Sequence, residues 1–124
     1  MTVQIIEIAG NRMAVLPENE YRQLLDVAED REDRDAAIEA EERRSSGEEY
    51  VPASVVDALL AGESPLRVWR QYRGLTQTEL ASRIDVSKMT ISGMEKRSRS
   101  GSVKVWRALS DALDVSLDDL LPEE

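Results

Sequence analysis

Only two residues, Asp85 and Val86, separate two segments that carry the sequence signals of short helices. Thr76 and Glu79 have the spacing of a capping box, in which both side chains bind backbone N–H groups at the start of a helix. Ser87 is a favourable cap for the helix that follows. A two-residue connection leaves room only for a tight corner, so the sequence predicts a pair of short helices joined by a turn.

Three further helices are predicted around this pair. Ser64-Pro65 provides a cap followed by proline at the first helical position, where no hydrogen bond is lost. Ser102 and Ser116 are caps for two more helices. The apolar residues of the five segments recur at helical spacing and include Leu66, Trp69, Leu80, Ile84, Ile91, Met94, Trp106, Leu109, Leu113 and Leu120. Residues 63–124 are therefore expected to form a five-helix domain.

The N-terminal residues predict two strands and a helix. Residues 3–8 and 13–16 are rich in β-branched and apolar side chains, and residues 9–11 (Ala-Gly-Asn) suit a tight turn between them. A helix is expected to begin near Pro17, with an apolar face formed by Tyr21, Leu24, Leu25 and Ala28. A unit of roughly 30 residues buries too little surface to be stable alone. We therefore expect its apolar face to need a second copy or another partner.

The middle of the chain is strongly charged. Residues 29–44 are strong helix formers with almost no apolar stripe, which is typical of a solvated helix or a disordered tether. The alternative is an acidic segment that folds onto a basic partner. After a Ser-Ser-Gly break, residues 52–61 predict a short amphipathic helix that docks on the C-terminal domain or on a partner, with an apolar face formed by Val55, Val56, Leu59 and Leu60.

Together these segments predict a mainly α fold in three parts. Residues 1–45 form a strand-strand-helix region, for contact with a second copy or another partner, that continues into an acidic helix. Residues 46–62 form a linker with a short amphipathic helix, and residues 63–124 form the five-helix domain.

The formal net charge of -9 is unevenly distributed along the chain. Residues 1–62 contain 6 basic and 15 acidic side chains, and residues 108–124 contain 6 acidic side chains and no basic ones. Residues 64–107, in contrast, contain 10 basic and 3 acidic side chains. Because salt screens charges over about 8–10 Å, distant carboxylates need not cancel a local positive face. A polyanionic partner for residues 64–107 is therefore compatible with the total charge.

The composition excludes several classes of function. The chain contains no cysteine and no histidine, so it lacks thiolate ligands, disulfides and the usual general base. We therefore expect no metal site, no cofactor and no enzymatic activity. The sequence has no apolar run of roughly 18 residues and no basic leader, so we expect a cytoplasmic protein without membrane spans.

Residues 64–121 resemble the helix-turn-helix domain of the xenobiotic-response-element family, which includes the phage lambda-type repressors. The resemblance rests on TQ-x-ELA at residues 76–81, on VS-x-x-TIS at residues 86–92, and on Glu95. It implies a lambda-repressor-like fold that binds double-stranded DNA through the helix starting at Ser87. Asp85 stands where the family usually has glycine, and aspartate enters the left-handed region more easily than most residues.

The resemblance also implies individual roles. Gln77 matches a position whose exposed side chain binds a phosphate. The DNA-contacting residues of the recognition helix and the loop after it would be Ser87, Lys88, Met89, Thr90, Ser92, Gly93, Lys96, Arg97 and Arg99. Among them, Lys88 can donate to guanine and Met89 can contact a thymine methyl group. Arg70 and Glu95 correspond to a structural ion pair. Trp69 and Trp106 are expected in the core or an interface, because duplex DNA offers no free base faces for stacking.

Residues 10–26 resemble the opening of prevent-host-death-like antitoxins, and the whole chain resembles helix-turn-helix antitoxins encoded beside RelE/ParE-type toxins. This resemblance implies a homodimeric repressor of its own operator that neutralises a basic toxin. The toxin-binding residues would be Tyr21, Leu24, Leu25, Ala28, Val55, Val56, Leu59 and Leu60. The alternative is a stand-alone phage-like or metabolic repressor that uses residues 1–62 only for dimerisation. A pure interaction scaffold would leave the capped recognition helix and the basic block unexplained.

Overall fold

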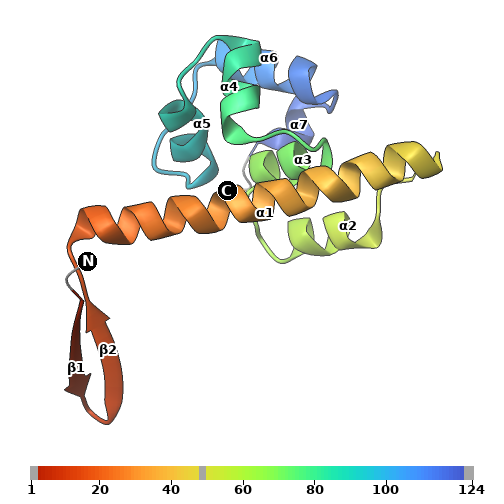
Figure 1. Ribbon diagram of the computed structural model, residues 1–124. Helices are drawn as coiled ribbons and strands as arrows, with labels where there is room; N and C mark the ends of the chain where they lie inside the picture. The colour runs from red at the N-terminus through yellow and green to blue at the C-terminus, as the bar shows by residue number, and fades with distance from the viewer. Residues whose placement is uncertain (1–2, 48–49, 122–124) are drawn as a thin grey trace. The chain divides into compact units, whose positions relative to one another are not determined.

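The computed structural model describes residues 3–47 and 50–121, and these are mainly helical (Figure 1). A β-hairpin of β1 (Gln4–Ile8) and β2 (Asn11–Val15) precedes the helices α1 (Glu18–Ser46), α2 (Ala53–Leu60), α3 (Pro65–Tyr72), α4 (Gln77–Ile84), α5 (Lys88–Glu95), α6 (Val103–Leu113) and α7 (Leu117–Leu120). The predicted fold class is confirmed, with α3 to α7 as the five helices expected in the C-terminal part.

Backbone contacts divide the chain into two compact units. Residues Met1–Glu32 form the first, called the N-terminal unit below, and Asp33–Glu124 form the second, the C-terminal unit. The boundary falls inside α1. The predicted division into 1–45, 46–62 and 63–124 remains a prediction about functional parts, and its residues 1–2, 48–49 and 122–124 lie outside the described residues.

The hairpin of the N-terminal unit is closed by a two-residue turn. β1 and β2 pair antiparallel, with Ile8 opposite Asn11, and Ala9 and Gly10 connect them with φ angles of 52° and 81°. Positive φ at both turn residues matches the right-handed twist of paired strands. The predicted strands are confirmed, although Asn11 belongs to β2 and not to the turn. All ten strand residues are exposed. A two-stranded hairpin with no packed face is only marginally stable in water.

The C-terminal part of α1 packs on α3. Asp33 and Ala40 are buried, and Ala36 and Ala37 are half-buried. Residues 29–44 therefore form a helix that is solvated over most of its surface, as one expectation had it, but they are not a disordered tether and one face of the helix is docked. A stripe of small side chains lets the two backbones approach closely, so the helix docks without large apolar residues. Gly74 marks this approach, because a Cβ atom on it would lie 2.9 Å from the Cβ of Ala40.

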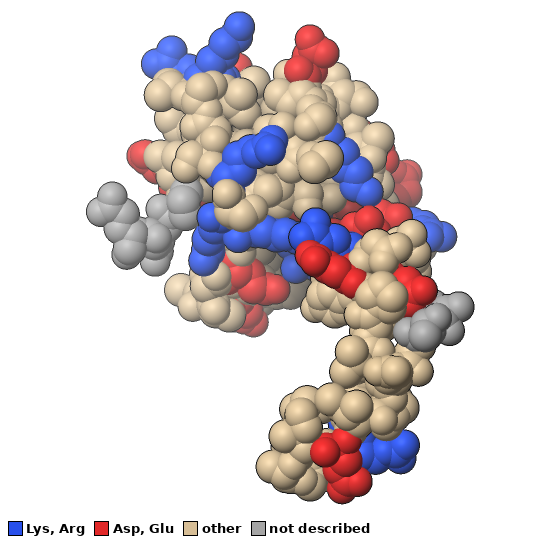
Figure 2. Space-filling model, turned by 90° about the vertical axis from the view of Figure 1, so that its left-hand side faces the viewer, with Lys and Arg blue, Asp and Glu red and all other residues tan. Residues whose placement is uncertain are grey.

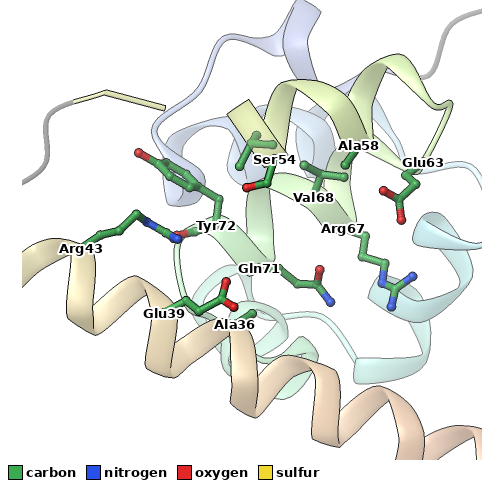
Figure 3. A pocket seen from close by; sticks show the side chains of 11 residues that line it. Ala36, Glu39, Arg43, Ser54, Ala58, Glu63, Arg67, Val68, Gln71 and Tyr72 are labelled. Atoms are coloured by element: carbon green, nitrogen blue, oxygen red, sulfur yellow. The ribbon is translucent and has the colours of Figure 1, made fainter. Parts of the chain in front are cut away.

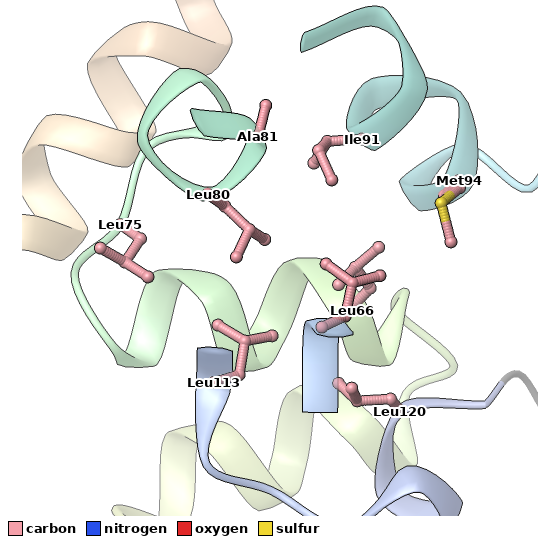
Figure 4. Close-up of a cluster of buried hydrophobic side chains, with 9 residues drawn as sticks. Leu66, Leu75, Leu80, Ala81, Ile91, Met94, Leu113 and Leu120 are labelled. Atoms are coloured by element: carbon pink, nitrogen blue, oxygen red, sulfur yellow. The ribbon is translucent and has the colours of Figure 1, made fainter. Parts of the chain in front are cut away.

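The core of the C-terminal unit is enclosed by α3 to α7 (Figure 4). Its buried side chains are Leu66, Leu75, Leu80, Ala81, Ile91, Met94, Leu109, Leu113 and Leu120, and Trp69 and Trp106 pack against them half-buried. The five predicted caps are confirmed: the side chains of Ser64, Thr76, Ser87, Ser102 and Ser116 each accept a hydrogen bond from the backbone N–H three residues later. Local capping and one apolar face therefore specify each of these short helices.

Helix α2 packs on α3 with only part of its apolar surface. Val55 is buried and Leu59 is half-buried, whereas Val56 and Leu60 are exposed. The single apolar face predicted for these four residues is wrong, because adjacent residues of a helix point about 100° apart. The exposed fraction of Leu60 is 82%, so the outward side of α2 remains available to a partner.

Gly74 provides a test of the α1–α3 packing. Gly74→Ala should lower the free energy of unfolding by about 2 kcal/mol or more, because alanine is strained at φ 73° and its Cβ atom would clash with Ala40. Gly62→Ala is the matched control, since Gly62 also has a positive φ (85°) but no atom within 4 Å of a Cβ placed there. Urea denaturation measures both. Equal losses in the two variants would contradict close packing of α1 on α3.

Candidate nucleic-acid interface

Helices α4 and α5 meet at the corner that the sequence predicts. Asp85 ends α4 in the left-handed conformation (φ 58°, ψ 49°) and donates its backbone N–H to the carbonyl of Ala81. Val86 also donates its N–H to Ala81, at 3.0 Å, and Ser87 then caps α5. Ala81 is buried, and its small side chain allows the two helices to pack closely. This geometry is a helix-turn-helix.

Helix α5 has one buried and one outward face. Ile91 and Met94 pack into the core, while Ser87, Lys88 and Met89 are exposed at the N-terminal end. Met89 is an apolar side chain with an exposed fraction of 75%, and Lys88 beside it supplies hydrogen-bond donors. The predicted contact residues Thr90, Ser92 and Gly93 are half-buried on the same helix. The structure thus brings the six predicted residues 87–90, 92 and 93 together on α5 and its cap.

Arg99 lies against the recognition helix. Its Nη1 atom donates to Oγ1 of Thr90 at 3.1 Å, and Oγ1 of Thr90 is 2.9 Å from Oγ of Ser87. Gly93 allows this approach, because a Cβ atom on it would lie only 3.1 Å from the Cβ of Arg99. These contacts hold a guanidinium beside the outward hydroxyl groups of α5, which suits combined contacts to phosphate and base edges.

Arg97 is directed elsewhere. It adopts a left-handed conformation (φ 59°), and its Nη2 atom donates to the carbonyl of Gly62 at 3.0 Å. It lines a hollow together with Asp118 and Asp119 of α7. The structure therefore does not group Arg97 with Arg99, whereas Lys96 is exposed immediately after α5.

The exposed side chain predicted for Gln77 is wrong. Gln77 is only 5% exposed, and its Nε2 atom donates to Oε2 of Glu95 at 2.7 Å. The carboxylate of Glu95 is buried and needs hydrogen-bond donors, and the first residue of α4 is in position to provide one. The amide of Gln77 is therefore hydrogen-bonded inside the domain and does not point to solvent.

Arg70 and Glu95 are brought together in the interior, with both side chains buried. Nε of Arg70 donates to Oε1 of Glu95, and Nη1 donates to the carbonyl of Leu75 at 2.8 Å. A second carboxylate takes part, because Oδ2 of Asp33 lies 2.9 Å from Nη1 of Arg70. Burial lowers the pKa of Arg70, but its hydrogen bonds to Glu95 and Asp33 and their negative charges outweigh this, so the pKa lies above its usual value. Arg70 therefore remains charged at every pH at which proteins are normally studied.

Sequence reasoning missed Asp33. It stands in a run of acidic residues, and nothing about its type distinguishes it from its neighbours. The signal that could have found it is spacing: Asp33, Ala36, Ala37 and Ala40 occupy positions i, i+3, i+4 and i+7 of a helix, which share one face. A face of small residues with one acid is compatible with docking onto a buried arginine.

Some basic side chains of residues 64–107 bind groups inside the domain, and others are exposed on its surface. Arg70 is buried, and Arg73 donates to the carbonyls of Leu113 and Asp114 at the end of α6. Fewer than the 10 basic residues counted in 64–107 therefore remain for DNA. Figure 2 shows blue Lys and Arg side chains scattered over the face in view, with uncharged surface and some red Asp and Glu side chains between them. The candidate interface is a set of separate cationic positions around α5.

A cavity of about 150 Å³ lies between α1, α2 and α3 (Figure 3). Glu39, Glu63, Arg43 and Arg67 contribute charges of both signs to its wall. Ligand pockets usually enclose roughly 300–1,000 Å³, so this one is small for a cofactor. Within residues 3–47 and 50–121 there is no group of three or more side chains that could hold a metal ion, and no helix there is long and apolar enough to cross a membrane.

Comparison with known proteins agrees with the geometry of α4 and α5. Residues 66–120 match the helix-turn-helix family model. The match covers α3 to α7 and does not include the hairpin, α1 or α2. A comparison with curated proteins found no match. A helix-turn-helix domain indicates a DNA-binding transcriptional regulator, a class whose members are typically not enzymes.

Lys88 provides a test of the interface. Lys88→Ala should weaken binding to the specific duplex by about 1–3 kcal/mol if its ammonium group contacts a base, and should reduce sequence preference. Arg12→Ala in the hairpin is the matched control, since it removes the same charge outside the helix-turn-helix domain. Fluorescence anisotropy with labelled duplexes measures both affinities. An equal effect of the two substitutions would show that only total charge matters.

Proposed function

We propose that the protein is a sequence-specific repressor that binds its own operator as a homodimer. The observation that carries this proposal is the capped α4–α5 pair, with Lys88 and Met89 outward at the N-terminal end of α5. In a dimer, two copies of α5 would enter the major groove at half-sites about 34 Å apart. Lys96 and Arg99 would bind the phosphate backbone and set the salt dependence of affinity.

We further propose that the protein is the antitoxin of a type II toxin–antitoxin pair and neutralises a basic RelE/ParE-type toxin. The support comes from the N-terminal unit, in which none of the described residues is buried. Its exposed large apolar residues are Val3, Ile5, Ile6, Ile8, Met13, Val15, Tyr21, Leu24, Leu25 and Val27. An apolar surface of this kind is typical of a site that binds another protein.

The charge of the N-terminal unit fits a basic partner. Residues 3–32 contain seven acidic and three basic side chains. Complementary charge would direct the encounter, and the apolar residues would supply the affinity. The predicted toxin-binding residues Tyr21, Leu24, Leu25 and Ala28 are all exposed, as are Val56 and Leu60 of α2. Val55 is buried and Leu59 half-buried on the α3 side, so we place neither in the proposed toxin-binding surface.

A second candidate is a stand-alone repressor whose N-terminal unit serves only for dimerisation. The hairpin favours it, because the exposed apolar residues lie on both faces: Ile6 and Met13 are partners on one face, and Ile5 and Ala14 are partners on the other. A second copy could cover such a surface through two-fold symmetry. DNA binding is common to both candidates, whereas toxin neutralisation belongs only to the first.

Leu24→Glu tests the role of this surface. The substitution places a charge on an exposed apolar position, so it should leave the fold intact and abolish binding of any partner that covers Leu24. Gln23→Glu adds the same charge at the neighbouring exposed position of α1 and is the matched control. Sedimentation velocity of the protein alone and growth rescue of cells that express the neighbouring gene product are the two measurements.

The two measurements separate the candidates. Loss of growth rescue by Leu24→Glu but not by Gln23→Glu supports the antitoxin. Loss of the dimer, with a neighbouring gene product that does not impair growth, supports the stand-alone repressor. Unchanged dimerisation and unchanged rescue would contradict any role of this surface.

A further inference from the structure

Asp33 connects α1 to the helix-turn-helix domain through an ion pair that is almost free of solvent. Its side chain is 5% exposed and that of Arg70 is 1% exposed. Oδ2 lies 2.9 Å from Nη1 of Arg70, and Oδ1 accepts a hydrogen bond from Nε2 of Gln71 at 3.2 Å. Both oxygens of Asp33 thus bind α3, which begins the segment that matches the helix-turn-helix family.

The same guanidinium holds the end of the recognition helix. Nε and Nη2 of Arg70 both donate to the carboxylate of Glu95, the last residue of α5. Gln77, the first residue of α4, donates to the same carboxylate. A continuous set of buried polar contacts therefore runs from α1 through Arg70 to α5 and α4.

Arg70 and Glu95 would already form a neutral pair without α1. Asp33 adds a second carboxylate, so the cluster buries two negative charges against one positive charge. Excess buried charge costs free energy unless hydrogen bonds compensate it, and here the amides of Gln71 and Gln77 each donate one. The carboxylate of Asp33 is costly to bury. A role in fixing the arrangement of the helices around Arg70 therefore explains it better than a gain in stability alone.

We propose that Asp33 is a positioning residue for DNA recognition, which acts through Arg70 and Glu95 to fix α5 against the rest of the domain. This proposal rests on the DNA-binding function proposed above. With α1 docked, Arg70 is held between two carboxylates and α5 keeps one orientation. Without the Asp33 contact, the side chain of Arg70 can move together with Glu95, and α5 can change its tilt. Because α1 begins at Glu18 in the N-terminal unit, a partner bound there that undocks α1 would also weaken DNA binding.

The experiment uses the full chain with Asp33→Asn, an isosteric change that removes one charge from the cluster. Asp35→Asn is the matched control, because Asp35 is exposed on the same helix and the change in net charge is identical. Anisotropy titrations on the upstream duplex and on a scrambled duplex give specific and non-specific affinities. Amide chemical shifts of residues 88–95 report the environment of α5.

Asp33→Asn should weaken specific binding roughly fivefold or more relative to Asp35→Asn, a typical effect of coupling between two sites. Non-specific binding should be equal in the two variants, because the phosphate-binding residues are intact. The amide signals of residues 88–95 should move only in Asp33→Asn, although no atom of Asp33 contacts α5 in the interactions described above. A purely local structural role would leave both the specificity ratio and these signals unchanged.

Three results would overturn the proposal or its premise, and they are distinguishable. Equal specific affinity and unmoved α5 signals in the two variants overturn the positioning role. Global unfolding of Asp33→Asn also overturns it, since Asp33 would then serve stability. No preference of the unsubstituted protein for its upstream duplex contradicts the proposed function itself, whatever the α5 signals show.

Discussion

The buried guanidinium of Arg70 constrains the C-terminal unit more than any other single group. A charge in the interior must be paired and its N–H groups must be hydrogen-bonded. Arg70 meets this requirement with Glu95 from α5, Asp33 from α1 and the carbonyl of Leu75 before α4. Two segments far away in the sequence, α1 and α5, and the carbonyl of nearby Leu75 therefore surround one side chain of α3. The apolar core is enclosed by α3 to α7, and this cluster joins α1, α3, α4 and α5 through buried polar contacts.

Acidic and basic side chains are separated along the chain. Acidic residues outnumber basic ones in α1 and in residues 108–124, while residues 64–107 are basic. Part of that basic excess is used internally, since Arg70 is buried and Arg73 binds the carbonyls that end α6. Of the eight basic residues of this segment that remain, Lys88 lies at the N-terminal end of α5 and Arg99 donates to Thr90 of α5.

Much of the fold could be predicted because its signals are local. Five serine or threonine caps, the two-residue corner at Asp85-Val86 and the apolar periodicity of the helices each depend on neighbours in the sequence. Three features were not predicted, because each is set by contacts with other elements that the local signals describe only in part. The amide of Gln77 is buried by Glu95, Asp33 is buried by Arg70, and α2 buries Val55 but not Val56 because α3 covers one side only.

The residues predicted to contact DNA show the same difference between local and tertiary signals. The sequence places Lys88 and Met89 outward on α5, since they follow the cap and precede the apolar Ile91. It does not distinguish Arg97 from Arg99. That difference arises from the loop, in which Arg97 takes a positive φ and binds Gly62 while Arg99 binds Thr90. Side-chain direction in irregular segments is set by tertiary contacts, which sequence spacing does not encode.

The most direct test of the central claim is the affinity of the full chain for its upstream DNA, measured by fluorescence anisotropy at several salt concentrations against a scrambled duplex of equal length. The account predicts tight binding that weakens with salt and clearly favours the upstream duplex, in spite of the net charge of -9. Equal binding to both duplexes at low salt, or binding to neither, would contradict the claim that α5 recognises a specific DNA sequence.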